Sequence, residues 1–107
     1  MTGETNGRRA PRPTTLRIAL GAGFRGHTVV IVVNGREVYR RADVTTDAMT
    51  AQADVVTTAV TSPTARLAVS VHPGELLATL DLDLSRHGNV AISLVGEATV
   101  SIETYGT

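Results

Sequence analysis

Hydrophobic and polar residues alternate along most of this chain, the pattern of strands that bury one face. Leu16, Ile18 and Leu20 alternate with polar or small residues, so we expect a first strand from Thr14 or Thr15. Between residues 76 and 85, four leucines and an alanine occupy every second position, and polar residues fill the others from Thr79 onward. Similar strands are expected near residues 54–61, 67–71, 90–94 and 100–102, with turn residues between them.

Residues 28–39 predict a β-hairpin. A β-branched run from Thr28 to Val33 is followed by Asn34-Gly35 and a second strand that reaches Tyr39. Both turn residues tolerate a positive φ, so the type I′ turn that matches strand twist is favoured. Residues 45–52 leave two alternatives open, a short helix with Thr46 as its N-cap or a loop that leads into the next strand.

Short strands separated by turn residues at a spacing of about ten residues are typical of an all-β fold. We therefore predict an eight-stranded antiparallel β-sandwich, jelly-roll-like or Greek-key, over residues 14–107. Residues 1–13 contain Thr, Gly, Asn, Arg and Pro but few apolar residues, which predicts a disordered basic tail.

The first hairpin strand is apolar on both faces. Val30 and Val32 occupy one face and Val29, Ile31 and Val33 the other, whereas a strand with one wet face should alternate. The tail, the loop after residue 45 or another subunit would have to cover the second apolar face. We take Val29, Ile31 and Val33 as the candidate interface residues for a second copy or a protein partner.

The composition excludes several kinds of chemistry. All ten basic residues are arginine, so no lysine can form a Schiff base, and the absence of cysteine excludes disulfides and thiolate sites. Ten basic and ten acidic residues balance, so the charge favours neither nucleic acid nor an anionic membrane as a partner. No apolar stretch follows the N-terminal charges, so we expect a cytoplasmic protein.

Gly21-Ala22-Gly23-Phe24-Arg25-Gly26 matches the G-x-G-x-x-G pattern of dinucleotide-binding loops. In those loops the last glycine opens a helix, whose N-terminus holds the pyrophosphate. Here a strand follows directly, so the loop is interpreted as a connection whose glycines adopt positive φ. Phe24, the single phenylalanine, is expected to close one end of the core.

Strand alternation predicts which polar residues share an end of the fold. Asn34, Arg36, Ser62 and His87 are expected at one end. Imidazoles and carboxylates are expected together at the other, where they would suit a divalent cation such as calcium. These candidate metal ligands are His27, His72, Asp43, Asp47, Glu75 and Glu97. No tight ligand spacing supports the site, and we assign no resident cofactor.

Three functional hypotheses remain. The first is a non-catalytic module for protein–protein interaction or structural assembly, and we favour it because catalytic groups are scarce. The second is a domain that binds a divalent metal or a carbohydrate with the loops at the His27/His72 end, although few aromatic residues are available to stack on a sugar. The third is a hydrolase, but no Ser–His–acid arrangement shares one end of the predicted fold, so we do not expect an enzyme.

Overall fold

The structure is a computed structural model that describes residues 13–86, 88–96 and 99–105. This part of the chain contains strands and no helix, which confirms the all-β prediction. The strands are β1 (Thr14–Leu20), β2 (Arg25–Val33), β3 (Arg36–Thr45), β4 (Asp54–Val60), β5 (Thr64–His72), β6 (Leu76–Asp83), β7 (Asn89–Val95) and β8 (Thr99–Tyr105).

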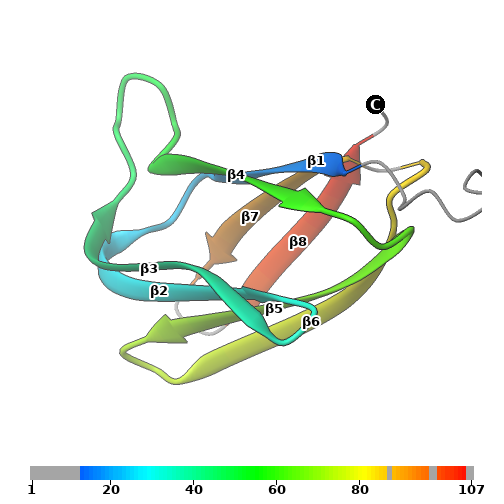
Figure 1. The fold of residues 1–107 in the computed structure, drawn as a ribbon. Helices are drawn as coiled ribbons and strands as arrows, with labels where there is room; N and C mark the ends of the chain where they lie inside the picture. Colours follow the sequence, from blue (N-terminus) through cyan, green and yellow to red (C-terminus); the bar gives the residue numbers. More distant parts are fainter. Residues whose placement is uncertain (1–12, 87, 97–98, 106–107) are drawn as a thin grey trace, which may run out of the picture.

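The strands form two sheets of four, seen as two layers in Figure 1. One sheet has the order β4-β1-β7-β8 and the other the order β3-β2-β5-β6. The prediction of wholly antiparallel sheets is wrong at one pair, because β1 and β7 run parallel. The strands β2 to β6 lie between β1 and β7 in the sequence. The direction of β7 is therefore set by the crossovers between the sheets and not by a hairpin turn.

The inner faces of both sheets contribute to one hydrophobic core. Phe24 is buried in it, as expected. Val29, Ile31 and Val33 also belong to this core and are 0%, 0% and 5% exposed. Their assignment as interface residues is therefore wrong, since packing within the chain already covers them.

The outward residues of β2 are Val30 and Val32. Val30 lies in register between Arg40 of β3 and Ser70 of β5, and it is 9% exposed. Val32 lies between Glu37 and Ala68 and is half-buried. An ion pair of 2.8 Å joins Arg40 to Glu37 beside these two positions. The second apolar face of β2 is thus flanked by the polar and small side chains of its two neighbouring strands.

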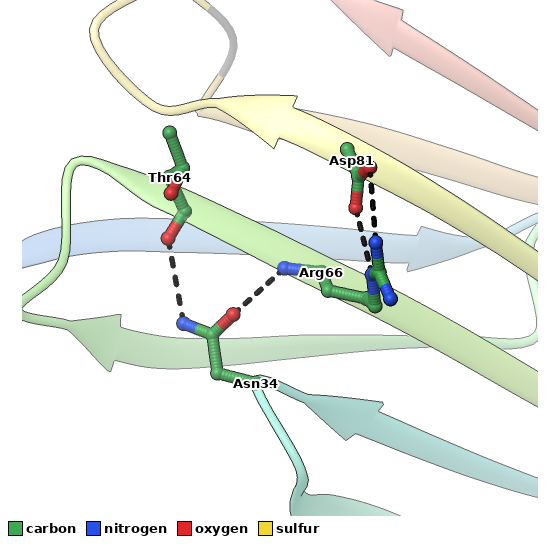
Figure 2. Close-up of polar contacts among 4 residues, drawn as sticks. All are labelled: Asn34, Thr64, Arg66 and Asp81. Atoms are coloured by element: carbon green, nitrogen blue, oxygen red, sulfur yellow. Dashed lines mark hydrogen bonds and ion pairs between the residues drawn. The ribbon is translucent and has the colours of Figure 1, made fainter.

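The Asn34-Gly35 hairpin is confirmed, with φ of 52° and 81° at the two turn residues. The Asn34 side chain also reaches across to β5, as Figure 2 shows: its Oδ1 accepts from the backbone N–H of Arg66 at 2.7 Å, and its Nδ2 donates to the Thr64 carbonyl at 3.4 Å. On the same strand, the Arg66 guanidinium pairs with Asp81 of β6 at 2.9 Å. One turn residue therefore fixes the hairpin and the start of β5 together.

The segment between β3 and β4 is a loop, which decides between the two alternatives left by the sequence. Asp47 and Gln52 form an isolated antiparallel bridge, and the Met49 N–H donates to the Asp47 carboxylate at 2.7 Å. The loop stands away from both layers in Figure 1. Met49 near its tip is 93% exposed.

Residues 1–12, most of the predicted basic tail, lie outside the described residues. Strand β1 begins at Thr14, as the alternation predicts. A search of the described residues for a helix of bilayer-spanning length and hydropathy finds none.

The glycine-rich segment is a corner that carries the chain from β1 in one sheet to β2 in the other. The Gly21 N–H donates to the Ile92 carbonyl at 2.7 Å, and the Leu94 N–H donates to the Ala22 carbonyl at 2.9 Å. Thr46 holds the opposite side, because its hydroxyl accepts from the Phe24 N–H at 3.0 Å and donates to the Gly21 carbonyl at 2.6 Å. The glycines serve backbone packing, and a strand follows them, as expected.

Gly23 is the position in this corner that excludes a side chain. Its φ is +95°, and a Cβ there would overlap the Leu94 carbonyl oxygen and approach the Leu94 Cβ at 2.8 Å. Gly35 has a similar φ of +81°, but open space surrounds it. The two glycines therefore separate the cost of backbone strain from the cost of steric overlap.

We expect Gly23→Ala to lower the free energy of unfolding by more than Gly35→Ala does. The backbone strain common to both costs about 1–3 kcal/mol, and overlap at Gly23 adds to it. Urea denaturation of the two variants measures the difference. Equal losses would mean that the corner can move away from Leu94 freely.

Candidate functional site

A cleft opens at the end of the fold where the glycine corner lies. Its volume is about 670 Å³. We call it the end cleft; it is lined by Gly23, Arg25, His27, Pro73, Gly74, Leu94 and Gly96. The glycine corner with the start of β2, the β5–β6 turn, and the end of β7 with the residue that follows it each contribute to the wall.

Three of the lining residues are glycines with positive φ: 95° at Gly23, 101° at Gly74 and 65° at Gly96. The Leu94 main chain fills the side-chain space at Gly23, whereas open space surrounds Gly96 and leaves the backbone there open to close approach by a ligand. Pro73 follows a cis peptide bond to His72. Among the described residues, the charged or ionisable side chains of the end cleft come from β2.

The His27 ring is held from two sides. Its Nδ1 accepts a hydrogen bond from the backbone N–H of Arg25 at 2.8 Å. The Phe24 ring meets it edge-on, with centroids 6.2 Å apart and an interplanar angle of 82°. Because Nδ1 is an acceptor, the neutral ring carries its proton on Nε2, which is then a donor.

Arg25 is exposed and lines the same cleft. It stands two residues before His27 on β2. The register against β3 shifts between these two residues and Gly26 has a φ of 75°, so a bulge, and not regular alternation, brings both of them to the cleft wall. Three other arginines, Arg40, Arg41 and Arg66, have carboxylate partners within 2.9 Å. Arg25 makes no ion pair with any residue that the structure describes, so its guanidinium has five N–H donors available to a ligand.

The predicted metal ligands share this end of the fold only in part. His27 lines the end cleft, and His72 is next to Pro73 at its edge. Asp43 lies near Gly26, Asp47 accepts the Met49 N–H in its own loop, and Glu75 is exposed in the β5–β6 turn. Glu97 and His87 lie outside the described residues.

Within residues 13–86, 88–96 and 99–105, no group of three or more His, Asp and Glu side chains is placed to hold one metal ion. The end cleft itself is lined there by a guanidinium, an imidazole and backbone, with no carboxylate. The described wall therefore lacks the carboxylate oxygens that calcium sites take from Asp and Glu. The contribution of Glu97 stays a prediction.

A second polar cluster, which we call the seam latch, joins the sheets where β3 faces β4. The Tyr39 hydroxyl donates to the Asp54 carboxylate at 2.8 Å, and the Arg41 guanidinium contacts the same oxygen at 2.9 Å. Tyr39 packs against the core, and the Asp54 side chain is 27% exposed. Farther along this seam, Arg36 and Val38 face residues 58–62 across a smaller hollow of about 170 Å³.

The seam latch shifts the ionisation of both its partners. Burial, together with the hydrogen bond to Asp54 and its negative charge, raises the pKa of Tyr39 from 10.0 to about 12. Burial alone would raise the pKa of Asp54, but hydrogen bonds from Tyr39, the Val55 backbone and Arg41 outweigh it and leave the pKa lowered. Tyr39 is therefore protonated and Asp54 ionised, as the latch requires, at pH values between the two pKa values.

We expect the latch to stabilise the fold in a defined pH window. The raised pKa of Tyr39 means that its contribution is complete below pH 10 and is lost as pH rises through about 12. The lowered pKa of Asp54 means that its contribution is present above 3.8 and is lost as pH falls through the folded value. Tyr39→Phe should cost about 1–2 kcal/mol at neutral pH, measured by urea denaturation.

Tyr105→Phe is the matched control, since it removes the other tyrosine of the chain, which is 50% exposed and bonds Glu103 at 3.2 Å. In that variant, tyrosinate absorbance reports Tyr39 alone and should rise with a midpoint near pH 12. Adding Asp54→Asn should move the midpoint down. A midpoint near 10 in Tyr105→Phe would contradict the latch.

Arg25 and the seam latch are the parts that the sequence analysis did not find. Arg25 stood inside the G-x-G-x-x-G match and was read only as part of a connecting loop. A bulge at Gly26 brings Arg25 and His27 to one wall, and alternation does not report a bulge. The latch joins residues 15 apart on edge strands of different sheets, and no periodicity relates them.

Comparisons of the chain with protein-family models, curated protein sequences and solved structures yield no match. Function is therefore argued from the residues themselves.

Proposed function

We propose that the protein is a non-catalytic module that assembles through a strand edge, with a second copy of itself as the occupant. The observation that carries this proposal is the edge of β4, which pairs with β1 on one side and, beyond the seam latch at Asp54, with no described strand on the other. From Val55 to Val60 this strand has no charged residue and no proline, and its register with β1 runs without a shift. Such an edge presents unpaired backbone groups to another strand.

The other edge strands carry more protection. β3 has three register shifts against β2 and contains five charged residues. β6 contains Asp81 and Asp83, and β8 contains Glu103 within the strand, whereas the one charged residue of β4, Asp54, is its first residue. Because bulges and charges discourage pairing between edges, β4 is the edge most open to a partner strand.

A second copy suits this edge on two grounds. The chain has a formal net charge of zero, so two copies meet without net repulsion. Antiparallel pairing of β4 with itself also gives a closed two-fold interface, the commonest form of homo-oligomer. Seven paired residues bury a small area, so the dimer should be weak.

Thr57 is the position that tests this arrangement. It is exposed at the middle of β4 and stands opposite Arg17 of β1. Thr57→Glu places a carboxylate beside Arg17, which supports the monomer, but brings two carboxylates together when β4 pairs with itself. We expect wild type to dimerise in sedimentation equilibrium and Thr57→Glu to raise the dimer Kd by about fivefold or more.

Thr79→Glu is the matched control, because Thr79 is an exposed threonine on β6, an edge strand of the other sheet. It should leave the dimer Kd unchanged. A wild type that stays monomeric at millimolar concentration contradicts the proposal, and so does equal weakening by both substitutions.

An eight-stranded sandwich with jelly-roll-like or Greek-key connections is the arrangement we propose for the two sheets. The crossovers support it: β1–β2, β3–β4, β4–β5 and β6–β7 each pass from one sheet to the other.

Ligand binding is a second candidate function, favoured by the volume of the end cleft. It does not depend on the β4 edge, which belongs to other elements. No phenylalanine, tyrosine or tryptophan is among the described lining residues, so a sugar would find no aromatic platform there. The chemistry of the wall instead indicates another class of ligand.

A further inference from the structure

We infer that the end cleft binds a small oxyanion, a carboxylate or phosphate group, with Arg25 and His27 as its donors. This inference rests on the second candidate function, that the end cleft is a ligand site. It replaces the divalent cation expected from the sequence by a ligand of opposite charge.

The ionisable groups of the described wall decide the sign of the charge on the ligand. Arg25 and His27 are the two ionisable side chains there, and both present N–H donors. The candidate carboxylates Asp43, Asp47 and Glu75 are absent from the lining. A cation in the cleft would face a permanent guanidinium charge, whereas an oxyanion would pair with it.

The donors are arranged for an oxyanion in two ways. The Arg25 guanidinium is a planar fork that matches two oxygens of a carboxylate or phosphate. The His27 ring is oriented by the Arg25 N–H on Nδ1 and by the Phe24 edge, so Nε2–H has a fixed direction. Arg25 thus supplies charge from its side chain while its own backbone orients the second donor.

The volume and walls fit a small ligand rather than a macromolecule. A cleft of about 670 Å³ falls in the range of small-molecule sites. The glycines at 74 and 96 let the ligand approach the backbone closely. Leu94 and Pro73 provide apolar surface for the part of a ligand that carries no charge.

The test is a titration of the whole chain followed by amide shifts in nuclear magnetic resonance. Sodium phosphate and sodium succinate are added separately against sodium chloride of equal ionic strength. We expect saturable shifts at Gly23, Arg25, Gly74 and Gly96, and the stronger of the two salts identifies the preferred anion. Arg25→Gln should weaken that binding at least tenfold.

Arg17→Gln is the control, because Arg17 is an exposed arginine of β1 and its loss changes the net charge equally. It should leave the affinity within twofold of wild type. Unchanged affinity in Arg25→Gln, or equal weakening by both variants, would overturn the assignment of Arg25.

Calcium chloride, zinc chloride and glucose are titrated in parallel to separate the two levels of the proposal. Saturable shifts at the cleft with one of these, and none with either oxyanion, would overturn the inference and leave the cleft a ligand site. No saturable shift with any of the five would overturn both. Binding of an oxyanion with loss in Arg25→Gln supports both.

Discussion

The close approach of the glycine corner to β7 is the constraint on which the arrangement of the two sheets depends. Gly23 fits against the main chain of Leu94, and two backbone hydrogen bonds beside it fix residues 21 and 22 to the same strand. The corner therefore sets where β2 begins relative to β1. Phe24 enters the core and Arg25 turns to the surface within one residue of each other, so core and cleft are positioned by the same turn.

Polar contacts outside the core connect strands that core packing alone does not join. The seam latch ties β3 to β4 although these strands belong to different sheets. Asn34 performs a comparable role at the other end. Its side-chain amide accepts the hydrogen bond that the backbone N–H of Arg66 would otherwise donate to a neighbouring strand. The latch joins edge strands of the two sheets, and Asn34 extends the contact between the inner strands β2 and β5 at its end.

Most of the fold could be predicted from the sequence, because alternation has a period of two and reports the buried face directly. It located β6, whose inward leucines are the more buried ones, and the hairpin at Asn34-Gly35. It could not decide which apolar face of β2 is inward, since Val30 and Ile31 look alike in a run of valines. Nor could it show that β1 and β7 run parallel, because that follows from distant crossovers and not from local pattern.

The sequence predicted at which end of the fold the candidate site lies, but it did not predict the chemistry of the site. Alternation placed His27 and the turn after His72 together, and both border the end cleft. It cannot show which way side chains in loops turn, and Asp47 uses its carboxylate on its own loop. The metal hypothesis counted every acid at that end as available, whereas the described wall contains none.

The placement of Met49 has a consequence for chemical durability. The chain contains two sulfur atoms, those of Met1 and Met49, and the second is at the tip of an exposed loop. The core that the structure describes is made of hydrocarbon side chains without sulfur. Oxidation to the sulfoxide would make Met49 polar where water already surrounds it, and would leave the packing between the sheets unchanged.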